Sequence, residues 1–126
     1  MRFLTMVKSK EPWGQPPQAL MDAIAKIGAE AFQSGKMVET GGLAPSAMSA
    51  RVRLQNGKIT VSDGPFTEAK EVVGGYAIFE LPSQKEAIEE TVKFMQLHKD
   101  HWPGWEGETE VRPIFSAPDF APGKKG

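Results

Sequence analysis

The stretch VVGGYAIFELPSQKE, residues 72–86, decides the fold class. Its first ten residues are apolar on both alternating faces, with Tyr76 on one face and Phe79 on the other. That pattern predicts a strand at the centre of a sheet. After the proline that ends the strand, Ser83 and Glu86 form a capping box, which starts a helix. The stretch therefore predicts a strand that runs directly into a helix.

The rest of the chain continues this alternation of strand and helix. Apolar residues from Leu20 to Ala31 recur three or four positions apart, which predicts a helix between a proline-rich break and Gly35. For the second helix we expect Ile88, Val92 and Met95 to be buried, with Ala87 and Phe94 beside them. The predicted strands are 3–7, 37–40, 72–81 and 110–115, and the predicted helices are 17–34 and 84–99.

Asn56-Gly57 predicts a β-hairpin together with its register. With these two residues at the tip, the pairs Leu54/Ile59 and Val52/Val61 share one face. The opposite face then carries Arg51, Arg53, Thr60 and Ser62. A shift by one residue would destroy this separation, so the register is well specified.

Without the hairpin, the predicted order is the βαββαβ plait of ferredoxin-like α+β domains, with an antiparallel sheet. Both helices would cover one face, and the apolar central strand leaves apolar side chains on the other. An open apolar face calls for a partner, so we expect a homodimer packed sheet to sheet. We expect one domain over residues 1–117 and a flexible tail rich in Pro, Gly and Lys over 118–126.

Composition excludes several classes of function. The chain has 15 basic and 16 acidic residues, which gives no basic excess for nucleic-acid binding. It has no cysteine, which removes disulfides and thiolate metal sites. Without a signal-like start or a run of about 20 apolar residues, we expect a cytoplasmic protein that does not enter membranes.

The segment VSDGPFTEAKEVVGGY, residues 61–76, resembles the hallmark of the DGPF branch of the YCII-related family. Two other segments agree with that branch: Gly41-Gly42-Leu43 before the hairpin and Glu110-Val111-Arg112-Pro113 in the last strand. Residues 98–108 resemble a DGPF subgroup with a link that contains His and Trp. The resemblance extends to Phe120 and implies the dimeric α/β barrel fold.

The resemblance implies less about function. The wider superfamily includes cofactor-free isomerases, lyases and small monooxygenases, and some YCII relatives act as dehydrochlorinases in aromatic breakdown. DGPF proteins are often encoded beside, or fused to, extracytoplasmic-function sigma factors, so a sigma factor is an implied partner. YCII relatives carry a proposed His-Asp dyad with an early histidine. Both histidines here lie after residue 97, so the dyad does not transfer by position.

The loop from Asp63 to Glu71 is the first candidate site. Gly64 allows a ligand to approach the backbone, and a carboxylate beside backbone N–H groups can act as a base. We therefore predict Asp63 as catalytic, and Gly64, Phe66, Lys70 and Glu71 as ligand-binding. An Asp-Gly-Pro turn also forms for purely structural reasons, with Asp63 capping its own backbone.

His98 and His101 lie three residues apart at the end of the second predicted helix. One interpretation is a favourable positive charge at a helix C-terminus. The other is general acid or base duty for His98, with His101 among the ligand-binding residues. No further acidic motif supports a metal site, and we expect none.

Trp102 and Trp105 can wall an apolar pocket, or they can cover the core or the dimer interface. Glu110 and Arg112 share one face of a strand, where they can form an ion pair or Arg112 can bind a carboxylate. Tyr76 completes the predicted ligand-binding residues. Gly74-Gly75 predicts a bulge or close packing rather than a phosphate loop.

Two functions remain open from the sequence. The first is a pocket walled by residues 63–71, the end of the second helix and the last strand, for a small carbonyl or carboxylate compound. Asp63 and His98 would move the proton, and Arg112 or Lys70 would bind the anion, in a cofactor-free lyase or isomerase. The second is a non-catalytic binding or regulatory module associated with a sigma factor.

Overall fold

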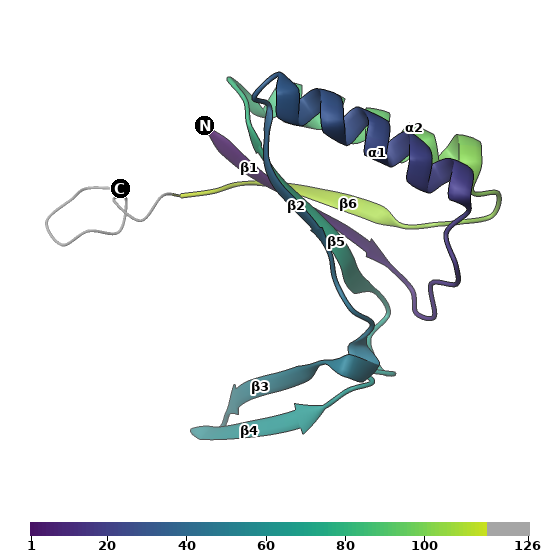
Figure 1. Ribbon diagram of the computed structural model, residues 1–126. Helices are drawn as coiled ribbons and strands as arrows, with labels where there is room; N and C mark the ends of the chain where they lie inside the picture. Colours follow the sequence, from purple (N-terminus) through teal and green to yellow (C-terminus); the bar gives the residue numbers. More distant parts are fainter. Residues whose placement is uncertain (116–126) are drawn as a thin grey trace, which may run out of the picture.

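The computed structural model describes residues 1–115, which form two helices and two antiparallel sheets (Figure 1). The strands are β1 (Arg2–Ser9), β2 (Met37–Gly42), β3 (Ala50–Gln55), β4 (Lys58–Asp63), β5 (Val72–Glu80) and β6 (Glu108–Pro113). The helices are α1 (Gln18–Gln33) and α2 (Gln84–His101), and one 3₁₀ turn spans Ser46–Met48. The mixed α+β class is confirmed. The predicted tail at 118–126 lies outside the described residues.

Four strands form one sheet in the order β2-β5-β1-β6, and all neighbours in it are antiparallel. Both helices cover the same face of this sheet, and no helix of the described chain covers the other (Figure 1). β5 is an interior strand, as its two apolar faces predict. β6 is an edge strand, which suits Pro113 because proline has no N–H to donate to a further strand. Neither described helix is long and apolar enough to cross a membrane.

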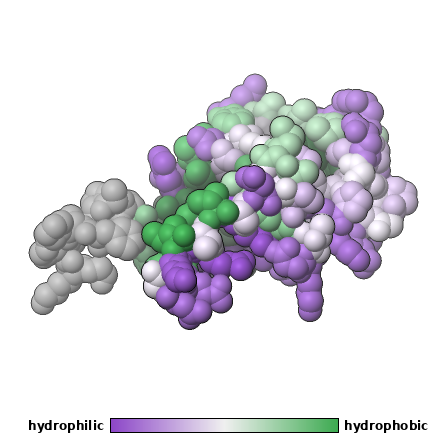
Figure 2. All heavy atoms as spheres, turned by 90° about the horizontal axis from the view of Figure 1, so that it is seen from below, coloured by the Kyte–Doolittle hydropathy of each residue, from purple (hydrophilic) through white to green (hydrophobic). Residues whose placement is uncertain are grey.

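The hairpin of β3 and β4 forms a separate two-stranded sheet with the predicted register. Leu54 pairs with Ile59 and Val52 with Val61, so the four apolar side chains share a face. The hairpin extends on the side of the sheet that faces away from the helices (Figure 1). Seen from that side, apolar residues lie exposed beside strongly hydrophilic ones (Figure 2).

The hydrophobic core lies at one end of the helix–sheet interface, where β1 and α2 begin. Its buried members are Phe3, Phe79, Leu81 and Ala87. Ser83 caps the start of α2 as predicted, because its hydroxyl accepts a hydrogen bond from the N–H of Glu86 at 3.3 Å.

The buried face of α2 differs from the prediction. Ile88 is 47% and Val92 58% exposed, whereas Ala87, Thr91 and His98 are buried. The buried and the predicted stripes both have helical spacing and differ by one residue, or about 100° of rotation. Phenylalanine rings from β1 and β5 already fill the space under the start of α2, which leaves room there for small side chains only.

Candidate functional site

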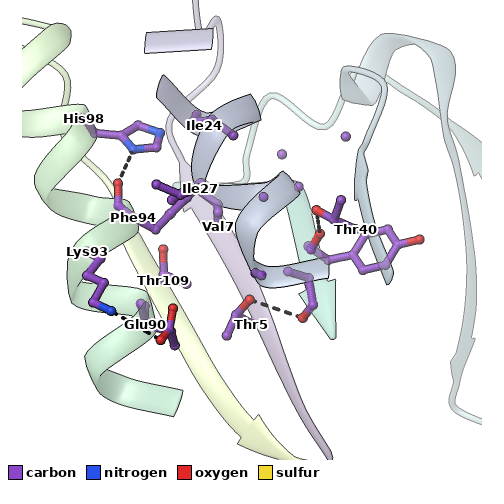
Figure 3. Close-up of a pocket in the computed structure, with 18 of the residues that line it drawn as sticks. Thr5, Val7, Ile24, Ile27, Thr40, Glu90, Lys93, Phe94, His98 and Thr109 are labelled. Carbon is purple, nitrogen blue, oxygen red and sulfur yellow. Dashed lines mark hydrogen bonds and ion pairs between the residues drawn. The ribbon is translucent and has the colours of Figure 1, made fainter. Parts of the chain in front are cut away.

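A cavity of about 710 Å³ lies between the helices and the four-stranded sheet. This volume falls within the range of roughly 300–1,000 Å³ that is usual for small-molecule sites. Small residues leave the space open, among them Gly28 and Ala31 on α1 and Gly75 and Ala77 on β5. The apolar wall includes Val7, Ile24, Ile27 and Phe94 (Figure 3). The apolar face of α1 that the sequence predicts therefore borders this cavity as well as buried residues.

His98 is the one ionisable side chain among residues 1–115 that is buried, with 6% exposure. Its Nδ1 lies 3.0 Å from the carbonyl oxygen of Phe94, one turn earlier on α2 (Figure 3). Because a carbonyl oxygen only accepts, this bond assigns the proton to Nδ1 and leaves Nε2 with a free lone pair. No described group bonds Nε2, and no fully buried polar side-chain atom in residues 1–115 lacks a partner. Nε2 is therefore accessible, and it is free to accept a hydrogen bond from a ligand.

Burial lowers the pKa of His98 by removing water from the imidazolium, and the hydrogen bond to Phe94 opposes this effect only in part. His98 is therefore neutral near pH 7. Burial therefore acts against the positive charge that the helix-end interpretation of His98 requires. A neutral histidine with an accessible lone pair is suited to accept a proton.

The link after α2 places two indole rings beside His98. In the turn from Trp102 to Trp105, the last N–H donates to the first carbonyl oxygen at 3.1 Å, and Gly104 has φ 82°. Proline second and glycine third are the residues that a type II turn prefers. The Trp105 ring centroid lies 4.5 Å from that of His98 and 6.0 Å from that of Trp102. Gly107 lies against Trp105, since a Cβ there would come within 2.6 Å of the indole.

Trp13 closes the cavity near the end of β1. Its indole donates to the carbonyl oxygen of Ser9 at 3.3 Å. The ring packs on Gly74, where a Cβ would lie 3.3 Å away. Gly74 is the extra residue of a bulge, because Val7 pairs with Gly75 and Lys8 with Val73. The predicted bulge is confirmed.

The threonine hydroxyls of the cavity wall all donate to protein acceptors. Thr5, Thr40, Thr91 and Thr109 donate to the carbonyl oxygens of Ala77, Tyr76 and Ala87 and to Sδ of Met95, respectively. Each hydroxyl oxygen keeps a lone pair, so these groups and Nε2 of His98 can only accept. Beside His98, the indoles of Trp105 and Trp102 are wall groups that can still donate.

The charged rim of the cavity is balanced. Lys36 and Lys93 each lie 3.4 Å from the carboxylate of Glu90 (Figure 3 shows the Lys93 pair). Glu30 is a second acidic group on the same wall. Two lysines and two glutamates give this rim no net positive charge to attract an anion.

The predicted loop at 63–71 is fixed at the base of the hairpin. Ser46 donates to the carboxylate of Glu11, and its hydroxyl accepts from the N–H of Phe66 at 3.0 Å. The N–H of Gly64 donates to the carbonyl oxygen of Ser49 at 2.8 Å. A Cβ on Gly64 would lie only 1.6 Å from the carbonyl oxygen of Ser46, so this close approach requires glycine.

Arg51 adds a second link at the same place. Its guanidinium lies 3.9 Å above the centroid of the Phe66 ring and pairs with Glu68. Asp63, Lys70 and Glu71 are exposed, and none of residues 63–71 lines the cavity beside His98. The contacts that Gly64 and Phe66 make therefore hold the base of the hairpin.

The structure brings some predicted site residues together and separates others. The cavity is lined by His98, Trp102, Trp105 and Tyr76, but not by Asp63, Gly64, Phe66, Lys70, Glu71, His101, Glu110 or Arg112. Tyr76 also donates to Glu39 at 2.7 Å, and this bond raises the pKa of the phenol. Glu110 and Arg112 form the ion pair that one interpretation predicts, at 3.9 Å.

Sequence reasoning missed Trp13 and the threonines of the wall. The sequence signal for Trp13 was its position as an isolated tryptophan in a loop rich in proline and glycine. Nothing in their spacing marks four threonines from different elements as one surface. Within residues 1–115, no three His, Asp or Glu side chains gather closely enough to hold a metal ion.

These features define an α+β domain with a mostly apolar cavity and one accessible histidine nitrogen. The family model described as the YCII-related domain matches residues 1–101, and the chain belongs to the YCII-related family. The matched range includes His98 and ends before the turn of Trp102 and Trp105. No curated protein matches the chain in sequence.

Proposed function

We propose that the protein binds a small, largely apolar molecule that carries a hydroxyl group, and that Nε2 of His98 accepts a hydrogen bond from this group. The observation that carries the proposal is the accessible Nε2 of a buried, neutral histidine in the cavity wall. The ring of Trp105 beside His98 offers a stacking surface to a flat ligand.

The hydrogen-bonding groups of the wall support this class of ligand. Because the threonine hydroxyls and Nε2 of His98 can only accept, a ligand that donates a hydrogen bond can pair with them. The balanced rim formed with Glu90 favours a neutral molecule over an anion. A phenol meets these requirements, and so does a carbonyl compound in its enol form. Carbonyl compounds are also part of the ligand class that the sequence predicts.

The proposed chemistry is a proton transfer without a cofactor. Nε2 of His98 takes a proton from the carbon next to a carbonyl group, which gives an enolate and an imidazolium. The imidazolium returns the proton at another carbon in an isomerisation, or protonates a leaving group in an elimination. Asp63 remains a predicted partner, and it requires a second copy of the chain because residues 63–71 lie off this cavity.

We also propose a more specific fold, family branch and oligomeric state for the protein. The strand order β2-β5-β1-β6, with both helices on one face, supports a ferredoxin-like plait. The segment at residues 61–76 supports the DGPF branch. The helix-free face, with the partly exposed Leu4, Met6 and Ile78, supports a homodimer packed sheet to sheet.

A titration followed by NMR at the tryptophan indoles tests the proposal. We expect saturable shifts at Trp105 with 4-methylphenol and at least tenfold weaker binding of toluene, which lacks the hydroxyl. His98→Phe keeps a ring beside Trp105 and should abolish this preference. His101→Gln is the matched control and should retain it, because His101 does not line the cavity.

Equal affinity for the two probes, or no saturable shift with either, would overturn the proposal. Binding that follows the expected pattern without turnover of any enolisable compound would assign the non-catalytic binding function.

A further inference from the structure

The cavity between the helices and the sheet is long in one direction. On β1 it is lined by Thr5, Val7 and Ser9, and the first and last of these lie roughly 13 Å apart along a strand. On α2 it is lined by both Thr91 and His98, which are separated by roughly 10 Å along the helix axis. Strand and helix therefore agree that the cavity continues well beyond His98.

The close-up of the cavity shows the same direction (Figure 3). His98 and Ile24 lie near the upper end, Ile27 and Phe94 lie below them, and Thr5 lies near the lower end. A ligand that occupies the whole cavity must therefore be elongated, with one end beside His98.

The part of the cavity away from His98 is apolar. Phe79 belongs to the hydrophobic core, Met37 packs against it, and both line the cavity. The hydroxyls of Thr5 and Thr91 already donate to backbone carbonyl oxygens at 3.2 and 2.8 Å. An apolar chain beside these two threonines therefore leaves neither hydroxyl hydrogen unpaired. This part of the cavity suits methylene groups.

Gly28 leaves room for such a chain in the wall that α1 contributes. It lies on the same helical face as Ile24 and Ala31, and all three line the cavity. A Cβ at position 28 would meet no atom within 4 Å. A larger side chain at this position would therefore extend into open space between the helix and the sheet.

We propose that the ligand is an elongated amphipathic molecule, whose hydroxyl group lies at Nε2 of His98 and whose unbranched apolar chain runs past Gly28 towards Phe79. The inference rests on the proposed function and adds the shape of the ligand to it. Gly28 is then a specificity-determining residue, because a side chain there would occupy the path of the apolar chain. A short phenol fills only the part of the cavity beside His98.

Three phenols test the shape of the ligand. 4-Pentylphenol has four more methylene groups than 4-methylphenol, and each methylene that leaves water improves affinity by roughly fourfold. In the NMR titration at the tryptophan indoles, we expect its dissociation constant to be at least about tenfold lower than that of 4-methylphenol. 4-(1,1-Dimethylpropyl)phenol has the same composition but a short and wide chain. It should bind at least about fivefold more weakly than 4-pentylphenol, because overpacking opposes the gain from burial.

Gly28→Val tests the path of the chain. Valine is more favourable than glycine inside a helix, so the variant should keep its fold. We expect it to weaken the binding of 4-pentylphenol by at least about tenfold and that of 4-methylphenol by less than about threefold. Ala29→Val is the matched control, because Ala29 is exposed on the same helix and does not line the cavity. It should leave both affinities unchanged.

Intermolecular NOEs locate the bound chain directly in the wild-type protein. The terminal methyl group of 4-pentylphenol should show NOEs to the methyl groups of Ala77 and Thr91, which line the cavity away from His98. The protons of its ring should instead show NOEs to the indole of Trp105.

Each unfavourable outcome has a distinct meaning. If 4-methylphenol binds in preference to toluene but gains nothing from the longer chain, or gains equally from the branched one, the elongated ligand is overturned and the proposed function stands. Unchanged binding of 4-pentylphenol in Gly28→Val, or NOEs from its terminal methyl group to other parts of the chain, would overturn the path past Gly28. No saturable binding of any of the phenols would overturn the proposed function, and this inference with it.

Discussion

Nδ1 of His98 donates to the carbonyl oxygen of Phe94 at 3.0 Å, and this bond leaves Nε2 as the free nitrogen of the ring. The bond lies within one turn of α2, so the helix itself fixes the tautomer. Trp105 packs on the same imidazole at 4.5 Å between centroids and restricts the ring plane. The carbonyl oxygen of Phe94 thus fixes the tautomer of His98, and Trp105 limits the orientation of its ring.

The buried histidine makes stability depend on pH. Because burial lowers the pKa of folded His98 below the value of about 6.5 in the unfolded chain, the unfolded state binds more protons at acid pH. The stability present above pH 6.5 should therefore fall as the pH drops through the folded pKa. Urea unfolding at pH 7.5 and pH 5 should show this loss in wild type and a smaller loss in His98→Phe. An equal loss in both proteins would show that His98 does not cause the pH dependence.

Gly64→Ala should strongly destabilise the hairpin base. Its Cβ would meet the carbonyl oxygen of Ser46 at 1.6 Å, and a backbone atom cannot move aside without disrupting the loop. We expect a loss of about 2–4 kcal/mol, measured by urea unfolding.

Gly28→Ala is the matched control for this substitution. Gly28 lies within α1, and a Cβ there would meet no atom within 4 Å. The same change should stabilise the protein by about 0.5–1 kcal/mol, since alanine favours a helix. A similar effect of both substitutions would contradict the packing described at Ser46.

Ser46→Ala removes the hydroxyl that joins Glu11 to Phe66. It should cost about 1–3 kcal/mol, because the Phe66 amide loses its partner and the half-buried carboxylate of Glu11 keeps only the backbone N–H of Ser46. Hydrogen exchange should accelerate at the Phe66 amide and remain unchanged at Phe79 in the core. Ser62→Ala, on the exposed strand β4, should leave both amides unchanged, and an unaltered Phe66 amide in Ser46→Ala would argue against the link.

Local sequence rules predicted the elements because each boundary has a chemical cause. Asn56-Gly57 specified the hairpin register, and Ser83 with Glu86 specified the start of α2. The buried stripe of α2 was predicted one residue away from its true position. Periodicity alone did not distinguish the Ile88 stripe from the Ala87 stripe, because the choice depends on what the sheet presents to the helix.

The site was predictable only in its local parts. His98, Trp102 and Trp105 lie within eight residues of each other, and all three are among the predicted site residues. The cavity itself depends on how far the helices stand from the sheet, which small residues such as Gly28 and Ala77 decide together. That property belongs to the packed structure and has no signature in one segment.

A long-range 1H–15N NMR spectrum of His98, recorded in the free protein and with 4-methylphenol, tests the proposed role of Nε2 most directly. We expect a neutral ring at pH 7, protonated at Nδ1, with an unprotonated Nε2 signal that shifts saturably as the phenol donates to it. A ring that is already an imidazolium, one protonated at Nε2, or an Nε2 signal that does not respond to a phenol bound beside Trp105 would contradict it.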